Sequence, residues 1–202
     1  FEFAVELDPG QAPSYVGLGR ARMERRCFEE AAQAFGRAID LKPDEAELYY
    51  HRGNALLAVG KHEEAFADYS RAIHLDPRHA GAYAVRGIAY HRHFHDREKA
   101  EKDFTRSIEL DPDAPMAPLN RGLLYQEMGL LPDAERDISR SLAIRATAEG
   151  FQLLGRVLRD RGEYDRADHT FRQALLACHD EPLRQSIEDD RKRNLEIQKG
   201  ER

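Results

Sequence analysis

The chain has 202 residues, of which 37 are acidic and 31 are basic, so its formal net charge is −6. Nucleic-acid-binding proteins usually concentrate positive charge on one surface, and no run here approaches the roughly 18 to 20 apolar residues of a membrane helix. We therefore expect no nucleic-acid partner and no membrane insertion. With 41% hydrophobic and 34% charged residues, the chain favours a thin, elongated fold over one thick core.

The two cysteines, Cys27 and Cys178, lie far apart and form no CxxC motif. This spacing favours a reducing compartment, and the opening stretch FEFAVELDPG lacks the layout of a signal peptide. We expect a cytoplasmic protein.

One unit of about 34 residues repeats along the chain. Acidic or basic residues followed by proline recur at spacings of 34, 34 and 35, at Pro9, Pro43, Pro77 and Pro112. A glycine recurs in step, at Gly19, Gly53, Gly87, Gly122 and Gly155. An aromatic residue stands four positions before several of these glycines, as Tyr49 does before Gly53.

The second half of each unit has its own pattern. A small residue recurs at Ala31, Ala65, Ala100, Ala134 and Ala167. Four positions later stand Phe35, Tyr69, Phe104, Ile138 and Phe171. These spacings of three and four are helical, with a loop midway and a proline stop. They predict two antiparallel helices per unit that approach closely at glycine and alanine while the large side chains fill the space beside them.

The aromatic-x2-Leu-Gly, Ala-x3-Phe-x2-Ala and proline pattern resembles the tetratricopeptide repeat family almost throughout residues 1 to 178. The resemblance implies an all-α, right-handed superhelical solenoid of antiparallel helix pairs, with the first helix of each pair lining a concave face. Residues 1–9 match the end of a preceding, truncated repeat. Five units follow, at about 12–45, 46–79, 80–114, 115–147 and 148–180, and residues 181–202 form a C-terminal capping helix and tail.

The expected helices follow from this register. In chain order the pairs are 12–25 with 28–41, 46–59 with 62–75, 80–93 with 97–110, 115–128 with 131–144, and 148–161 with 164–177, followed by a single helix over 181–199. His95 is an extra residue in the third unit, which predicts a bulged loop near 93–97. In the fourth unit Pro118 replaces the aromatic residue, so the start of that helix should be irregular.

Two substitutions occur together in the second, third and fourth units. Arginine replaces the leucine before the repeat glycine, and the same units place aspartate before the large side chain of the second helix. The three pairs are Arg52 with Asp68, Arg86 with Asp103, and Arg121 with Asp137. Because a half-buried guanidinium requires an acceptor, we predict an Arg–Asp contact inside each of these units, with a structural role.

The concave face is the expected binding surface for a peptide with hydrophobic anchors and scattered polar or acidic groups. Its expected residues are Arg20, Tyr50, His51, Asn54, Leu57, Val85, Ile88, His91, Met116, Asn120, Leu123, Gln126 and Arg156. Some of the apolar members could instead pack successive units together. Some family members hold a chaperone's C-terminal carboxylate with basic and amide side chains, but the matching positions here lack those cations.

No catalytic motif is present: the chain has no P-loop, no GxSxG and no HExxH. His91 and His95 have the spacing of a helical metal pair, but two ligands do not complete a zinc site, and a solvated helix end is the simpler interpretation. The run Asp189-Asp190 followed by Arg191 to Arg193 is interpreted as a solvated helical face.

We therefore expect a non-enzymatic adaptor with no metal and no cofactor, whose partner is a protein or peptide. Two alternatives stay open. The chain could assemble with copies of itself as a homo-oligomeric scaffold, or it could be the regulatory module of a larger enzyme.

Overall fold

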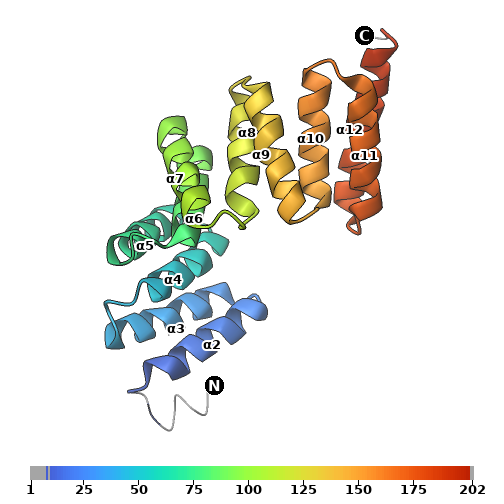
Figure 1. Cartoon of the computed structure of the whole chain (residues 1–202). Helices are drawn as coiled ribbons and strands as arrows, with labels where there is room; N and C mark the ends of the chain where they lie inside the picture. The colour runs from blue at the N-terminus through green and yellow to red at the C-terminus, as the bar shows by residue number, and fades with distance from the viewer. Residues whose placement is uncertain (1–7, 9, 201–202) are drawn as a thin grey trace. The chain divides into compact units, whose positions relative to one another are not determined.

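The computed structural model describes residue 8 and residues 10–200, which form two compact units that divide between Leu110 and Asp111. The helices of unit 1 are α2 (Ala12–Glu24), α3 (Phe28–Leu41), α4 (Ala46–Ala58), α5 (His62–Leu75), α6 (Ala80–Arg92) and α7 (Arg97–Leu110). Those of unit 2 are α8 (Met116–Glu127), α9 (Leu131–Ile144), α10 (Ala148–Asp160), α11 (Tyr164–Ala177) and α12 (Glu181–Gln198). The described residues are therefore all-α, as the repeat pattern predicts (Figure 1).

Every helix boundary lies within one residue of the sequence-based expectation. Each first helix packs on the second helix of its own pair, giving α2 with α3, α4 with α5, α6 with α7, α8 with α9 and α10 with α11. The expected end of a preceding repeat, residues 1–9, lies outside the described residues except for Asp8, and so does the tail at 201–202.

The packing inside each pair explains the repeating glycine. A side chain from the second helix lies on the glycine of the first, so that a Cβ atom added there would come within 2.6 to 2.8 Å of it. These contacts are Phe35 on Gly19, Tyr69 on Gly53, Phe104 on Gly87, Ile138 on Gly122, and Phe171 on Gly155. All five large side chains are fully buried. Only glycine allows the two helices to approach this closely.

The turns within the pairs also repeat. Each has a residue in the left-handed region, namely Arg26, Gly60, His95, Gly129 and Gly162, with φ between 53° and 80°. The turn before α7 spans residues 93–96 and is one residue longer than the turn at 59–61. The backbone N–H of Phe94 still bonds to Ala89 and that of Asp96 to Tyr90. The loop thus absorbs the extra residue, as expected, and both flanking helices keep their lengths.

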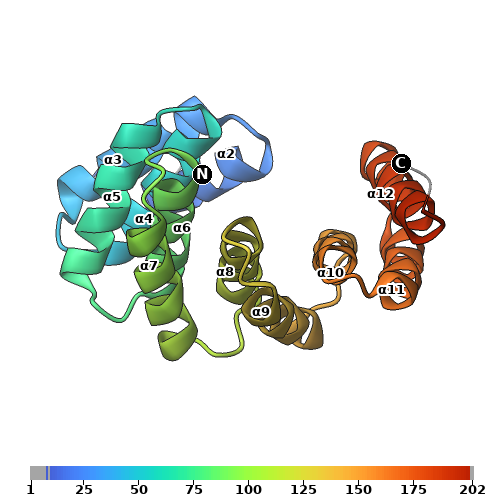
Figure 2. The same cartoon turned by 90° about the horizontal axis from the view of Figure 1, so that it is seen from above.

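In unit 2, α12 packs against both α11 and α10, and it lies beside α11 in both views (Figures 1 and 2). Ile187 of α12 is fully buried and joins Leu158, Phe171 and Cys178 in one hydrophobic cluster. Helix α12 is therefore part of the core of its unit. None of the described helices combines the length and apolar character needed to cross a bilayer.

Candidate partner-binding site

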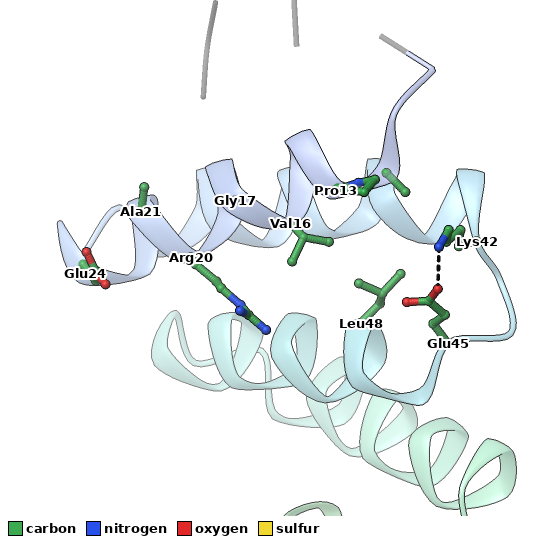
Figure 3. A pocket seen from close by; sticks show the side chains of 10 residues that line it. Pro13, Val16, Gly17, Arg20, Ala21, Glu24, Lys42, Glu45 and Leu48 are labelled. Atoms are coloured by element: carbon green, nitrogen blue, oxygen red, sulfur yellow. Dashed lines mark hydrogen bonds and ion pairs between the residues drawn. The ribbon is translucent and has the colours of Figure 1, made fainter. Parts of the chain in front are cut away.

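A cleft of about 450 Å³ lies between α2 and α4 in unit 1. Helix α2 supplies Ala12, Pro13, Val16, Gly17, Arg20, Ala21 and Glu24, and the opposite wall consists of Lys42, Glu45 and Leu48. Val16 and Leu48 face each other across it, and Arg20 extends from α2 toward α4 (Figure 3). We call this the α2–α4 cleft. It combines an apolar lining with a few charged groups, which is the usual character of a binding pocket.

The charges of the α2–α4 cleft are not all available to a ligand. Lys42 Nζ donates to Glu45 Oε1 at 2.8 Å, so this pair neutralises itself at one end of the cleft. Arg20 points instead to α4, where its Nη2 lies 3.3 Å from Nε2 of His51. Arg20 is exposed and is therefore the principal cationic group that the cleft offers to a ligand.

His51 belongs to a polar cluster beside the α2–α4 cleft. Glu47, one turn earlier on α4, places Oε1 3.2 Å from His51 Nε2 and Oε2 3.1 Å from His79 Nε2. The imidazole of His51 also stacks on Phe35, with ring centroids 5.3 Å apart. Burial lowers the pKa of His51, and the charges of Arg20 and His79 act in the same direction, whereas Glu47 opposes them.

Tyr50 and Asn54 continue the same face of α4. The Tyr69 hydroxyl donates to Asn54 Oδ1 at 3.0 Å, and burial raises the pKa of that hydroxyl far above its ordinary value. The Tyr50 ring lies 4.8 Å from the His79 ring. Asn54 thus uses its carbonyl oxygen inside the protein. The expected groove residues of α2 and α4 lie close together.

The expectation for α6 needs correction at two positions. Val85 and His91 are each only 8% exposed. Val85 lies one turn from Ala82, which packs on Ile73 of α5, and His91 lies one turn from Gly87, which contacts Phe104 of α7. Both side chains are therefore largely inaccessible to a ligand. Ile88 and Leu57 are half-buried.

The expected groove residues of unit 2 have partners within that unit. Leu123 packs against the cluster around Ile138. Asn120 Nδ2 donates to the Met116 carbonyl at 2.9 Å, and Gln126 Nε2 donates to Asp160 Oδ2 at 3.0 Å. Met116 is half-buried. These side chains are less available to a ligand than their helical register predicts.

Arg156, another expected groove residue, is paired within unit 2, although part of its side chain stays exposed. Its Nε donates to Asp190 Oδ2 of α12 at 2.6 Å, and the same carboxylate accepts bonds from Gln152 at 2.7 Å and from Arg159 at 3.3 Å. The neighbouring Arg191 donates to Asp168 Oδ1 at 2.6 Å. Asp190 and Arg191 therefore hold α12 on α10 and α11, and they are not the solvated groups that their charge run predicts. Asp189, Lys192 and Arg193 are exposed, as expected.

The three Arg–Asp contacts are present in the structure. Each guanidinium donates from Nε and Nη2 to the two oxygens of its aspartate, at distances of 2.6 to 3.0 Å. Asp68, Asp103 and Asp137 are buried. Because both oxygens are satisfied by a partner on the facing helix, the arrangement is that of a structural ion pair.

The histidines of the third unit do not form a metal cluster. His91 is buried in α6, whereas His95 lies in the exposed turn, and the ring of His93 stacks at 3.7 Å on His62 of α5. Within residues 8 and 10–200, no group of three or more potential ligands has the geometry to hold a metal ion.

Sequence reasoning missed four residues of the site: Val16, Glu47, Leu48 and His79. The repeat contains the signal for two of them. Val16 lies 34 residues before Tyr50, and Glu47 lies four residues before His51 on the same face of α4. The role of α12 also had a signal, because Ser186 and Asp190 stand 34 residues after Gln152 and Arg156.

Stacked antiparallel helix pairs with a recurring glycine contact define an all-α repeat protein. One family model described as tetratricopeptide repeat matches residues 16–80 and 53–93, and a second model with that description matches residues 151–185. The chain belongs to the tetratricopeptide repeat family. No curated protein matches it in sequence.

Solved structures show the same fold. TTC0263, a thermophilic TPR protein of Thermus thermophilus, is 23% identical and aligns over 89% of this chain and 98% of its own, with a TM-score of 0.73. PilW, a type IV pilus biogenesis factor, is 21% identical and aligns over 92% of this chain and 86% of its own, with a TM-score of 0.79. YrrB, described as a TPR protein with an unusual peptide-binding site, is 17% identical and aligns over 93% of this chain and 97% of its own, with a TM-score of 0.66.

Proposed function

We propose that this chain is an adaptor that binds a peptide segment of a partner protein in the α2–α4 cleft. The tetratricopeptide repeat fold supports a role in protein–protein interaction, and proteins of this family are generally non-enzymatic scaffolds. The observation that carries the proposal is the cleft itself, in which Val16 of α2 faces Leu48 of α4 beside the exposed Arg20.

The chemistry of the α2–α4 cleft specifies the kind of peptide. The half-buried Val16 offers an apolar surface for one hydrophobic anchor, whereas Leu48 lines the cleft from α4 but is only 2% exposed. The guanidinium of Arg20 offers donors to a carbonyl or carboxylate oxygen, and Nδ2 of Asn54 offers another on the neighbouring turn of α4. We infer an extended segment with an apolar side chain that enters the cleft and polar groups that follow the face of α4.

A binding screen with a cellular peptide library tests this proposal. The test variants are Ala21→Arg, which fills the cleft from α2, and Arg20→Ala, which removes its cation. The matched controls are Ala67→Arg on the exposed side of α5 and Arg37→Ala on α3, both outside the cleft. We expect the test variants to lose at least tenfold in affinity and the controls to bind like the wild type.

Equal losses in test and control variants would place the binding surface elsewhere. Light scattering on the same samples distinguishes an adaptor from a self-assembling scaffold. An adaptor should be monomeric without its peptide, whereas a scaffold should change mass with concentration.

A further inference from the structure

His51 stands between a cation and an anion that compete for one of its ring atoms. Nε2 lies 3.3 Å from Arg20 Nη2 and 3.2 Å from Glu47 Oε1. In a neutral imidazole with its proton on Nδ1, Nε2 accepts a hydrogen bond. Arg20 can donate that bond, whereas the Glu47 carboxylate has no hydrogen to donate. In the protonated ring Nε2 carries a hydrogen, so it donates to Glu47 and no longer accepts from Arg20.

Glu47 is held in position for this exchange by His79. The Nδ1 atom of His79 accepts the backbone N–H of Ala82 at 3.2 Å, which assigns the ring proton to Nε2. That Nε2–H donates to Glu47 Oε2 at 3.1 Å. The carboxylate is thereby fixed with its other oxygen toward His51, ready to accept the new N–H without a large movement.

The remaining surroundings of His51 favour its neutral form at pH 7. Phe35 of α3 stacks on one face of the imidazole, and Tyr50 of α4 lies 5.5 Å away. The charged and titratable groups around the ring are Arg20 from α2, Glu47 from α4 and His79 from the turn before α6. Burial lowers the pKa of His51, so the neutral ring prevails near pH 7, and in its Nδ1–H tautomer Nε2 accepts the bond from Arg20.

We propose that protonation of His51 releases Arg20 into the α2–α4 cleft, where its guanidinium binds a carboxylate of the partner peptide. This inference rests on the proposed function of the cleft and adds the ligand class and its regulation. On acidification two cations would stand 3.3 Å apart, so Arg20 turns away from His51. Lys42 is already paired with Glu45, which leaves Arg20 as the group that receives the carboxylate.

The release has one competitor on α2. Glu24 follows Arg20 by one helical turn and also lines the α2–α4 cleft. Exposed pairs within one helix are weak, so Glu24 does not prevent a ligand carboxylate from binding.

The first experiment needs no peptide. Nuclear magnetic resonance titration of the His51 ring in the intact chain should give a pKa below the ordinary histidine value. Arg20→Leu should raise that pKa, and Glu47→Gln should lower it. A pKa that neither variant moves would overturn the exchange, whatever the peptide screen shows.

The second experiment uses formate as a carboxylate probe at constant ionic strength. Formate should bind the wild type about fivefold more tightly below the His51 pKa than above it, the effect of about one added unit charge some 4 Å away in water. The Arg20 Nε–H resonance should report the binding. His51→Gln should remove the pH dependence, whereas His74→Gln, an exposed histidine on α5, should keep it.

Tighter formate binding at neutral pH, or a pH dependence that survives in His51→Gln, would overturn the proposal. A peptide screen without binders alongside the expected titration would reject the proposed function and leave the Arg20–His51 exchange intact. Thermal unfolding of each variant checks that the fold is retained.

Discussion

Arg52 and Asp68 connect the two helices of one pair through two parallel hydrogen bonds, Nε to Oδ2 at 2.8 Å and Nη2 to Oδ1 at 2.7 Å. Asp68 is only 5% exposed, and its carboxylate has both oxygens occupied by the guanidinium. The first and last pairs of the chain have Leu18 with Ala34 and Leu154 with Thr170 at these positions. The same contact between the two helices of a pair is therefore ionic in some units and non-ionic in others.

This comparison predicts a strong coupling between Arg52 and Asp68. Asp68→Ala leaves the half-buried guanidinium without its acceptor and should lower the free energy of unfolding by about 1 to 3 kcal/mol. The double variant Arg52→Leu with Asp68→Ala reproduces the Leu18 and Ala34 combination, so it should recover most of that loss. Urea unfolding of the two single variants and the double variant measures the coupling. Additive losses would show that the contact contributes no coupling.

Two helical glycines should respond in opposite directions to alanine. A Cβ at Gly53 would lie 2.6 Å from Tyr69 Cε1, so Gly53→Ala should destabilise the protein by about 1 to 3 kcal/mol. At Gly36 the nearest atom would be Arg52 Nη1 at 3.9 Å, so Gly36→Ala should stabilise α3 by about 0.5 to 1 kcal/mol. Thermal and urea unfolding check both signs. A stabilising Gly53→Ala would contradict the close approach of α4 and α5.

The attachment of α12 should depend on one carboxylate. Asp190→Asn weakens the bonds from Gln152, Arg156 and Arg159, and we expect a loss of about 1 to 3 kcal/mol together with faster amide exchange in α12. Asp189→Asn is the matched control, because Asp189 is exposed and accepts its bond from Gln185 on its own helix. It should stay within about 0.5 kcal/mol of the wild type. Equal exchange rates in both variants would show that apolar packing alone holds α12.

Tyr69 should make the protein sensitive to alkaline pH. Burial raises the pKa of its hydroxyl in the folded chain, whereas in the unfolded chain it ionises near its ordinary value of about 10. Its contribution to stability is therefore complete below pH 10 and is lost as the pH rises from there toward the folded pKa. Tyr69→Phe should flatten this fall at a cost of about 1 kcal/mol for the lost bond to Asn54.

The measurement is urea unfolding as a function of pH, with tyrosinate absorbance as the second readout. Tyr15→Phe is a suitable control, because it removes another tyrosine hydroxyl from the same unit. A Tyr69→Phe protein with an unchanged alkaline profile would contradict the role given to burial.

The repeat period predicted a large part of this structure. Helix boundaries, the contact of Tyr69 with Gly53 and the meeting of Arg52 with Asp68 all follow from it. These features depend on which faces of two consecutive helices meet, and a helical period fixes those faces to within one residue. The same reasoning placed Arg20, Tyr50, His51 and Asn54 on neighbouring faces of α2 and α4.

The period could not decide which side chains of the expected groove remain free. Whether Arg156 is free depends on a further helix, α12, which packs on α10. A run of charged residues has the same sequence pattern on a packed helix as on a solvent-exposed one. The contact of His51 with Arg20 likewise depends on the distance between two helices, whereas Glu47 lies one turn away on the same helix as His51. Sequence spacing records the direction of a side chain along its own helix, whereas its partners depend on how closely the neighbouring helices pack, which only the tertiary structure contains.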